Sequence, residues 1–256
     1  MGARVAYLVA CFTLGACLYG CGGGGVPRED RASWRDKAEA ACLSSGAVNA
    51  TSYVQAGAPV SGKSACSIAT PLKVSGALGG RVGITPTATI NCPLTASLDR
   101  WLANSVQPAA YRQFGSQVVE IRQIASYSCR GRNGSRRGHL SEHAYGNAID
   151  IAAFRLANGE EITVVKGWWR GTSRERAFLR EAFAGACREF YTVLGPGSDR
   201  YHYNHFHVDL LVTNASRGRH YCRPSPGRGG AMALGPSDDD STASIGLIPF
   251  MGPGAD

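Results

Sequence analysis

Residues 141–150 read SEHAYGNAID and place His143 seven positions before Asp150. The immediate neighbours of this aspartate on both sides are alanine and isoleucine, a pattern typical of a buried strand. A carboxylate is costly to bury there unless a cation or another partner compensates its charge. An odd spacing puts two residues of an unbroken strand on opposite faces, but Gly146 lies between them and can turn the chain. The stretch therefore predicts a turn that leads into a strand and brings both polar side chains to one site.

A second polar stretch, NHFHVD at residues 204–209, follows further along the chain. Alternate residues of a strand share a face, so His205, His207 and Asp209 would point to the same side of a sheet. A catalytic zinc ion uses three ligands from histidine, aspartate or glutamate and keeps one position open for water. Together the two stretches predict one shared metal site.

The chain has 256 residues, enough for one domain with tails, and it is 44% hydrophobic and 18% charged. Its formal net charge of +8 favours nucleic acid, an anionic lipid surface or an acidic polymer such as a bacterial wall, or simply describes a basic soluble protein. Aromatic residues are not interleaved with the arginines of residues 130–138, which argues against nucleic acid.

The first 21 residues have the pattern of an export signal. Arg4 precedes an apolar run at residues 5–20, which is shorter than the roughly 20 residues of a membrane-spanning helix. Cys17 and Cys21 each follow small residues, as in bacterial lipoprotein signals, and the glycines after Cys21 favour it as the lipidated residue. An ordinary cleaved signal peptide is the alternative. Both interpretations predict an exported protein, and export also argues against a nucleic-acid partner.

Six cysteines lie outside the signal, an even number that predicts three disulfides in an exported domain. Six cysteines allow 15 pairings, and the sequence does not choose among them. The sequence has no Cys-x-x-Cys pair, so a zinc–thiolate cluster is disfavoured. The six residues are Cys42, Cys66, Cys92, Cys129, Cys187 and Cys222.

The remaining patterns predict an α+β fold with a small central antiparallel sheet that carries the metal site, about three flanking helices and stabilising disulfides. We expect a signal at 1–21, a linker at 22–33, a domain at 34–224 and a disordered tail at 225–256. The expected helices are 33–44 with Ser33 as N-cap, 96–114 with Thr95 as N-cap and a kink at Pro108, and 173–191. The expected strands are Val74, 81–84, 118–124, 148–154, 161–165 and 205–212, with a hairpin turn at Asn158-Gly159.

The decapeptide resembles the Ser-x-His-x-x-Gly-x-Ala-x-Asp motif of the D-alanyl-D-alanine carboxypeptidase and dipeptidase group. These zinc peptidases share a clan with lysostaphin-type endopeptidases and the hedgehog signalling domain. Over residues 34–224 the chain is similar to the bacterial extensin-like C-terminal domain family. That resemblance is carried by the opening at 34–42, SYSCR at 126–130, SEHAYGNAID and RYHYNHFHVDL at 200–210.

The resemblance implies that His143, Asp150 and His207 are zinc ligands and that His205 is the general base or stabilises the transition state. Many clan members have a glutamate base three residues before the last ligand, where this chain has Asn204. The resemblance further implies that a peptide carboxylate binds Arg130, which is displaced by two positions from the clan's Ser-x-Tyr-Arg segment, and that Ser141 contacts substrate. Arg132 is the alternative carboxylate ligand, and a solvated basic loop is the alternative role of these arginines.

Other polar and aromatic residues have two interpretations each. Trp168-Trp169 could line a sugar groove or pack in the core, and the core is favoured. His202 and Tyr203 could lie at the cleft rim or on the surface. Asp209 could orient a histidine or be a plain strand residue. His139 and His220 are expected to be uninvolved.

Two functions follow from these observations. The first is a zinc-dependent peptidase or amidase that acts on peptidoglycan peptides. The second is a non-catalytic wall-binding or structural lipoprotein that keeps the metal cleft as a docking site. In either case the expected location is the periplasm, with peptidoglycan as partner and a membrane reached through an N-terminal lipid. The sequence leaves the oligomeric state and the cleaved bond open.

Overall fold

The structure is a computed structural model that describes residues 26–27, 29–212 and 219–226. The predicted signal at 1–21, including Cys21, lies outside the described residues, as does all but the start of the predicted tail. None of the helices in the described part has the length and apolar character that crossing a bilayer requires.

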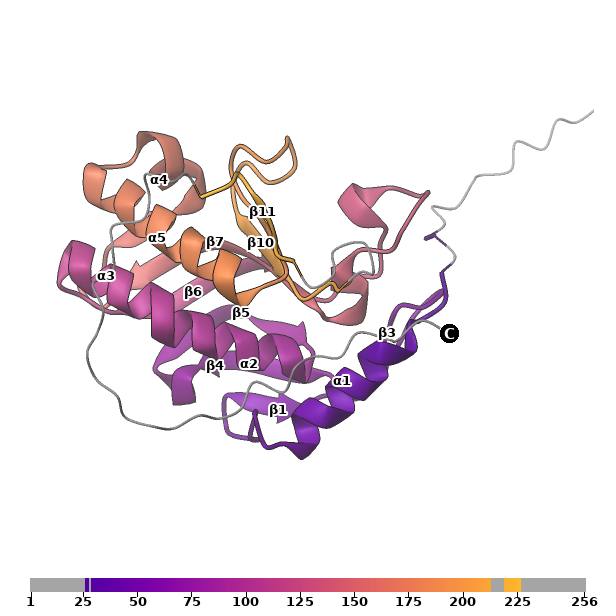
Figure 1. Cartoon of the computed structure of the whole chain (residues 1–256). Coiled ribbons are helices and arrows are strands. Elements are labelled where there is room, and N and C mark those ends of the chain that lie inside the picture. Colours follow the sequence, from indigo (N-terminus) through magenta and orange to yellow (C-terminus); the bar gives the residue numbers. More distant parts are fainter. Residues whose placement is uncertain (1–25, 28, 213–218, 227–256) are drawn as a thin grey trace, which may run out of the picture.

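The fold is α+β, as the sequence predicts, but its sheet is larger than expected (Figure 1). Nine strands form it, eight of them in the order β1-β4-β5-β6-β7-β10-β9-β11, with β8 paired to β7. It is mixed, because β5 pairs with β6 and β9 with β11 in parallel, whereas a purely antiparallel sheet was expected. The strands are β1 (Val54–Ala56), β4 (Leu72–Ala77), β5 (Val82–Ile90), β6 (Val118–Ala125), β7 (Ala148–Leu156), β8 (Glu161–Thr163), β9 (Thr192–Leu194), β10 (Phe206–Asp209) and β11 (Tyr221–Arg223), and a separate pair is β2 (Val60–Ser61) and β3 (Ser67–Ile68).

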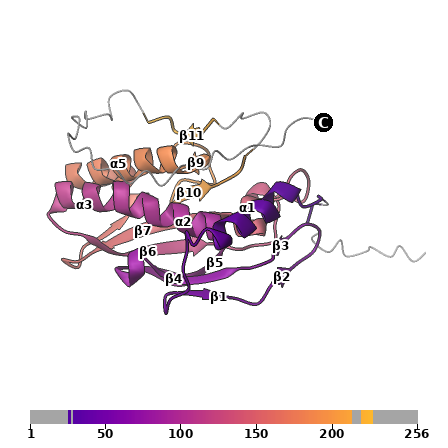
Figure 2. The same cartoon turned by 60° about the horizontal axis from the view of Figure 1, so that its bottom comes forward.

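Helices cover one face of this sheet (Figure 2). On β7, Ile149 and Ile151 belong to the core cluster that includes the helical aromatics, as do Phe206 and Val208 on β10. Side chains alternate along a strand, so Asp150 and His207 lie on the opposite face. The helices are α1 (Ser33–Ser44), α2 (Cys92–Trp101), α3 (Gln107–Phe114), α4 (Val164–Arg170) and α5 (Ser173–Glu189).

The ends of the helices differ from the sequence predictions in detail. The N-cap of α2 is Asn91, whose side chain accepts a hydrogen bond from the Leu94 N–H, so the assignment of Thr95 was wrong. α1 starts at Ser33 itself, with Ala32 at the N-cap position. The chain stays helical at Pro108: a π-helical turn at Leu102–Val106 precedes it, and Pro108 lies in the first turn of α3, where proline is tolerated.

Two predicted strands are shorter in the structure. The segment 161–165 is a strand only to Thr163, after which α4 begins, and the segment 205–212 is a strand only at β10. Part of the expected linker packs on the domain, since the Glu29 carboxylate accepts a hydrogen bond from the Leu140 N–H and Arg31 pairs with Glu39.

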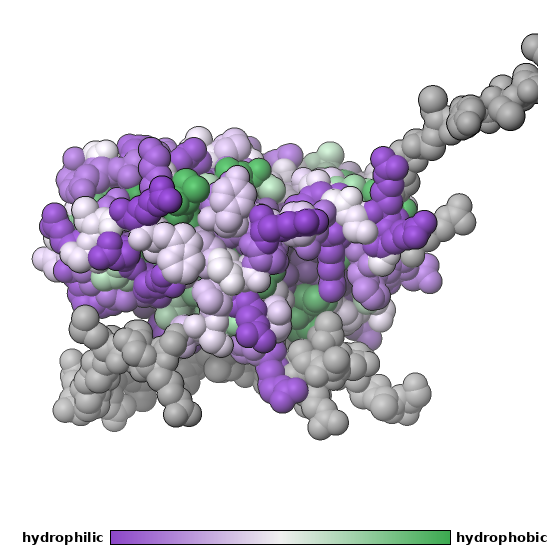
Figure 3. Space-filling view, turned by 90° about the horizontal axis from the view of Figure 1, so that it is seen from above, coloured by the Kyte–Doolittle hydropathy of each residue, from purple (hydrophilic) through white to green (hydrophobic). Residues whose placement is uncertain are grey.

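All six predicted cysteines form disulfides: Cys42–Cys92, Cys66–Cys129 and Cys187–Cys222. Each bond closes a loop of at least 35 residues, and bonds of this kind typically stabilise a domain by about 2–4 kcal/mol. The surface around this core is mostly hydrophilic on the side drawn in Figure 3, with only small hydrophobic areas.

Candidate metal centre

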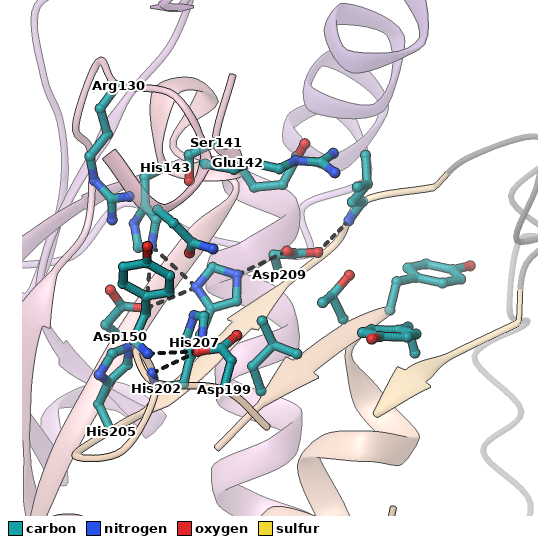
Figure 4. A pocket seen from close by; sticks show the side chains of 18 of the residues that line it. Arg130, Ser141, Glu142, His143, Asp150, Asp199, His202, His205, His207 and Asp209 are labelled. Atoms are coloured by element: carbon teal, nitrogen blue, oxygen red, sulfur yellow. Dashed lines mark hydrogen bonds and ion pairs between the residues drawn. The ribbon is translucent and has the colours of Figure 1, made fainter. Parts of the chain in front are cut away.

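Three side chains from distant parts of the chain converge on one point (Figure 4). Asp150 lies on β7 and His207 lies directly opposite it on β10, while His143 comes from the 3-10 turn η4 (Glu142–Tyr145). His143 Nε2 lies 3.2 Å from both His207 Nδ1 and Asp150 Oδ1, and the last two atoms lie 2.8 Å apart. The three residues predicted from the sequence as ligands are therefore brought together, and they form a group that could hold a metal ion.

The spacing of these three atoms matches a tetrahedral site. Zinc–nitrogen and zinc–oxygen bonds of 2.0–2.2 Å place neighbouring tetrahedral ligands about 3.3 Å apart. The three observed distances of 2.8–3.2 Å are close to that edge length. The side chains are also buried, with residue exposures of 1% for His143, 5% for Asp150 and 7% for His207. The donor set present in the chain thus fits a single small cation.

Both histidine rings are held by an outer partner. His143 Nδ1 lies 2.6 Å from the Ser126 carbonyl oxygen, and His207 Nε2 lies 2.9 Å from a carboxylate oxygen of Asp209. A ring nitrogen must carry the proton to donate to either acceptor, so the opposite nitrogen is left to bind a cation. Of the two interpretations of Asp209, the structure favours the residue that orients a histidine.

The electrostatics of the group are dominated by buried opposite charges. Burial lowers the pKa of His207, but hydrogen bonds to Asp150 and Asp209 outweigh burial and raise this pKa to about 10. Burial raises the pKa of Asp150, but the charge of His143 and the polar contacts with His143, His205 and His207 hold it well below its usual value. Asp150 is therefore an anion that positive charge beside it stabilises, and a bound cation would supply such charge.

Two further histidines lie beside the three ligands. His205 Nε2 is 3.5 Å from Asp150 Oδ1, and its Nδ1 is 2.8 Å from the Asn204 side-chain oxygen. The residue that sequence reasoning left undecided is His202, which is buried in the cleft. Its Nδ1 lies 2.7 Å from Asp199 Oδ1, and its ring centre lies 5.2 Å from that of His205. The sequence signal for a role of His202 is weak: an aspartate, Asp199, stands three positions before it and can orient its ring.

The histidines line a cleft of about 720 Å³. The residues predicted to bind substrate, Arg130 and Ser141, are among its lining residues, and so is Arg132. His220, which is expected from the sequence to be uninvolved, also lines the cleft. Trp168 is buried in the core, as favoured, whereas its neighbour Trp169 is 60% exposed outside the cleft lining. Tyr203 is on the surface, and His139 does not line the cleft.

A buried polar network supports the turn that carries His143. Both guanidinium amino groups of Arg35 donate to the Glu142 carboxylate at 2.6 and 2.7 Å, and Asn147 donates to the same carboxylate at 2.7 Å. Asn91 in turn donates to the Asn147 side chain at 3.1 Å. The turn is thereby joined to α1 and to the start of α2, a connection between residues far apart in sequence.

Gly146 closes this turn in a conformation that other residues rarely adopt. Its φ is +62°, and a Cβ atom there would lie 2.4 Å from the Ile68 side chain. Both the left-handed backbone and the close approach require glycine. The turn expected at Gly146 is therefore confirmed, and it is what brings His143 back over the strand that carries Asp150.

We predict that the group binds one divalent metal ion, tested with zinc, and that substitutions distinguish its ligands from their outer partners. Asp150→Asn, which keeps the shape but removes the charge, should abolish stoichiometric binding. Asp209→Asn should weaken binding about 10–100-fold, because Asp209 only orients a ligand. Metal analysis and competition with a chromophoric chelator measure both effects. His139→Ala, at an exposed histidine outside the cleft lining, is the control. Full zinc binding by Asp150→Asn would contradict the site.

We also predict that Arg35→Ala lowers the free energy of unfolding by about 3–5 kcal/mol, because it leaves the buried Glu142 carboxylate without its cation. Denaturant unfolding measures this loss. The matched control is Arg155→Ala, which removes an exposed ion pair with Glu120 and should change stability by at most about 1 kcal/mol. Equal effects of the two variants would show that the buried pair has no special role.

Comparison with known proteins identifies the family of the chain. No curated protein matches it, and no solved structure does. The family model described as Extensin-like protein C-terminus matches residues 40–223, which include every side chain of the metal group and its outer partners, whereas Arg35 lies before the match. Because the match covers more than half of the chain, this protein belongs to the extensin-like C-terminus family.

Proposed function

We propose that this protein is a zinc-dependent hydrolase that cleaves peptide or amide bonds in peptidoglycan. The observation that carries the proposal is the convergence of two imidazole nitrogens and one carboxylate oxygen within 2.8–3.2 Å of one another, with His205 beside them in an open cleft. Two histidines and one carboxylate form a donor set that zinc uses in hydrolytic enzymes.

His143, Asp150 and His207 would hold the zinc ion. When bound, zinc lowers the pKa of a coordinated water and polarises a carbonyl group. The resemblance of SEHAYGNAID at residues 141–150 to the zinc-peptidase motif supports this use of the three residues. Three close donors on the wall of a cleft, with room for a water molecule as a fourth ligand, support a catalytic rather than a structural site.

His205 would move the proton during the reaction. Its Nδ1 donates to the Asn204 oxygen, which leaves Nε2 on the side of Asp150 to accept a proton from water and to return it to the leaving amine. His202 would assist, because its ring centre lies 5.2 Å from that of His205 and 5.6 Å from that of His207. Burial lowers the pKa of His202 although Asp199 opposes this, so its ring is neutral and can accept or donate a hydrogen bond.

Arg130 and Ser141 would position the substrate. Both line the cleft with His143, and a guanidinium can bind a carboxylate through two parallel hydrogen bonds. Arg132 lines the same wall and is the alternative carboxylate ligand. The positive wall suits the acidic peptides of a bacterial wall, and the formal net charge of +8 suits the polymer as a whole.

We further propose that the protein is exported to the periplasm and held at a membrane by a lipid on Cys21. The apolar leader and the small residues before Cys21 support the lipid, and three disulfides suit an oxidising compartment. Under this proposal the linker holds the cleft within reach of the wall.

One observation favours a second function, that of a non-catalytic wall-binding lipoprotein. Asn204 occupies the position where the resembling peptidases have a glutamate base, and it contacts His205 rather than the metal group. A neutral amide cannot take a proton from water as a glutamate carboxylate can. In this case the cleft would bind stem peptides without cutting them.

Digestion of purified sacculi by the zinc-loaded protein separates the two functions. We expect the wild type to release soluble fragments, and His205→Ala to release them about 10²–10⁴-fold more slowly, because proton transfer contributes that much to hydrolysis. His205→Ala should retain zinc, since His205 is not one of the three ligands. His139→Ala is the control. Mass analysis of the released fragments identifies the bond. An inert wild type with one zinc ion per chain would favour the binding protein.

A further inference from the structure

The cleft continues past the metal group over two more strands. Beyond β10 the sheet continues with β9 and then β11. Paired residues share a face, and His207 pairs with Leu194 while Asp209 pairs with Thr192, which in turn pairs with Tyr221. The floor that carries the metal ligands therefore extends across the sheet. The lining residues on this extension are Tyr191, Thr192, Leu194, Arg219, His220 and Tyr221.

The extension is long enough for several residues of a substrate. Neighbouring strands lie about 4.8 Å apart, so β11 lies about 10 Å beyond β10, and an extended chain covers that distance with about three residues. On the other side of His207, Figure 4 shows Arg130 and Ser141, away from Asp209. The cleft therefore extends to both sides of the metal group, toward Arg130 and Ser141 on one side and over β9 and β11 on the other.

The surface over β9 and β11, which we call the shelf, is aromatic and cationic. The ring centres of Tyr191 and His220 lie 5.1 Å apart, and the angle between the ring planes is 34°. Tyr221 is 54% exposed. Arg219 adds a positive charge. The nearest carboxylates of the lining are already engaged, that of Asp209 by His207 and that of Asp199 by His202. Such a surface stacks on flat or apolar groups and attracts carboxylates.

The shelf is also fixed in place before any ligand binds. The Tyr191 N–H donates to the Asp209 carbonyl oxygen at 3.0 Å, and the Tyr221 N–H donates to the Tyr191 carbonyl oxygen at 2.7 Å. The Cys187–Cys222 disulfide ties β11 to α5. A preformed surface binds without first losing conformational freedom, so contacts on it contribute directly to affinity.

We infer that the cleft takes an internal segment of a longer acidic peptide and cuts within it, with the shelf binding the part of the chain beyond the cleaved bond. This inference rests on the proposed hydrolysis. In the reaction, water adds across the amide: the carbon–nitrogen bond breaks, the acyl carbon gains the oxygen and becomes a carboxylate, and the nitrogen leaves as a protonated amine. A substrate that ended at the metal would leave the shelf without contacts.

The test compares two peptides prepared from the same sacculi, cross-linked stem-peptide dimers and single stem peptides. We expect the zinc-loaded protein to cleave the dimers with a kcat/KM at least about tenfold higher, and to cut inside the cross-link. Tyr221→Ala should lower the ratio of dimer to monomer cleavage by about tenfold, mainly through KM, because one aromatic contact is lost. Tyr111→Ala is the matched control, since that tyrosine is 67% exposed on α3 and outside the cleft lining.

Binding to His205→Ala, which should hold substrate without turnover, gives a second readout. Calorimetry should show dimers binding about tenfold more tightly than single stem peptides, with the difference lost when Tyr221→Ala is added. Removal of only a terminal residue, with Tyr221→Ala behaving as the wild type, would overturn the inference and leave the hydrolase intact. Cleavage of neither peptide would instead contradict the hydrolase. Equal binding of both peptides would then overturn the role of the shelf as well.

Discussion

The antiparallel pairing of β7 with β10 sets His207 directly opposite Asp150, and the rest of the cleft depends on this register. A slip by one residue would turn the polar side chains into the helix-covered core and bring Phe206 and Val208 to the surface. The apolar residues on the helix side therefore enforce the position of the polar residues on the other side. Packing energy, which has no chemical specificity of its own, fixes the geometry of the metal group.

His143 lacks this support, because it lies on a turn and not on a strand. The chain compensates with contacts from three directions: the Ser126 carbonyl oxygen holds the ring, Gly146 closes the turn, and the pair of Arg35 with Glu142 anchors the turn to α1. A buried ion pair contributes little net stability compared with apolar packing, but it is costly to break on one side. Here its effect is positional, since it fixes the residue next to His143, a candidate metal ligand.

The sequence predicted the metal group well because the signals were local. A buried charge needs a partner, and alternate residues share a face, in any sheet. Asp150, His205 and His207 could therefore be identified without knowledge of the fold. The class of fold, the main helices and the long strands followed from periodicity in the same way.

The remaining features depend on contacts between distant segments. Strands of three residues such as β1, β9 and β11 show no periodicity, which is why the sheet was expected to be small. The disulfide pairing and the contact of Arg35 with Glu142 join residues far apart in the sequence, so they can be recognised only in the folded structure. Asn91 was missed as a cap because Thr95, one turn later, offers the same kind of side chain.

Two of the three disulfides stand next to segments that border the cleft: Cys129 precedes Arg130, and Cys222 follows Tyr221. These borders are loops and very short strands, which bury little apolar surface, whereas the helix side of the sheet has a continuous interior. A thiol reductant would therefore loosen the rims before it melted the interior. A newly made chain kept reduced would have a packed interior but loose cleft borders, and formation of the disulfides would be the step that orders the surface of the cleft.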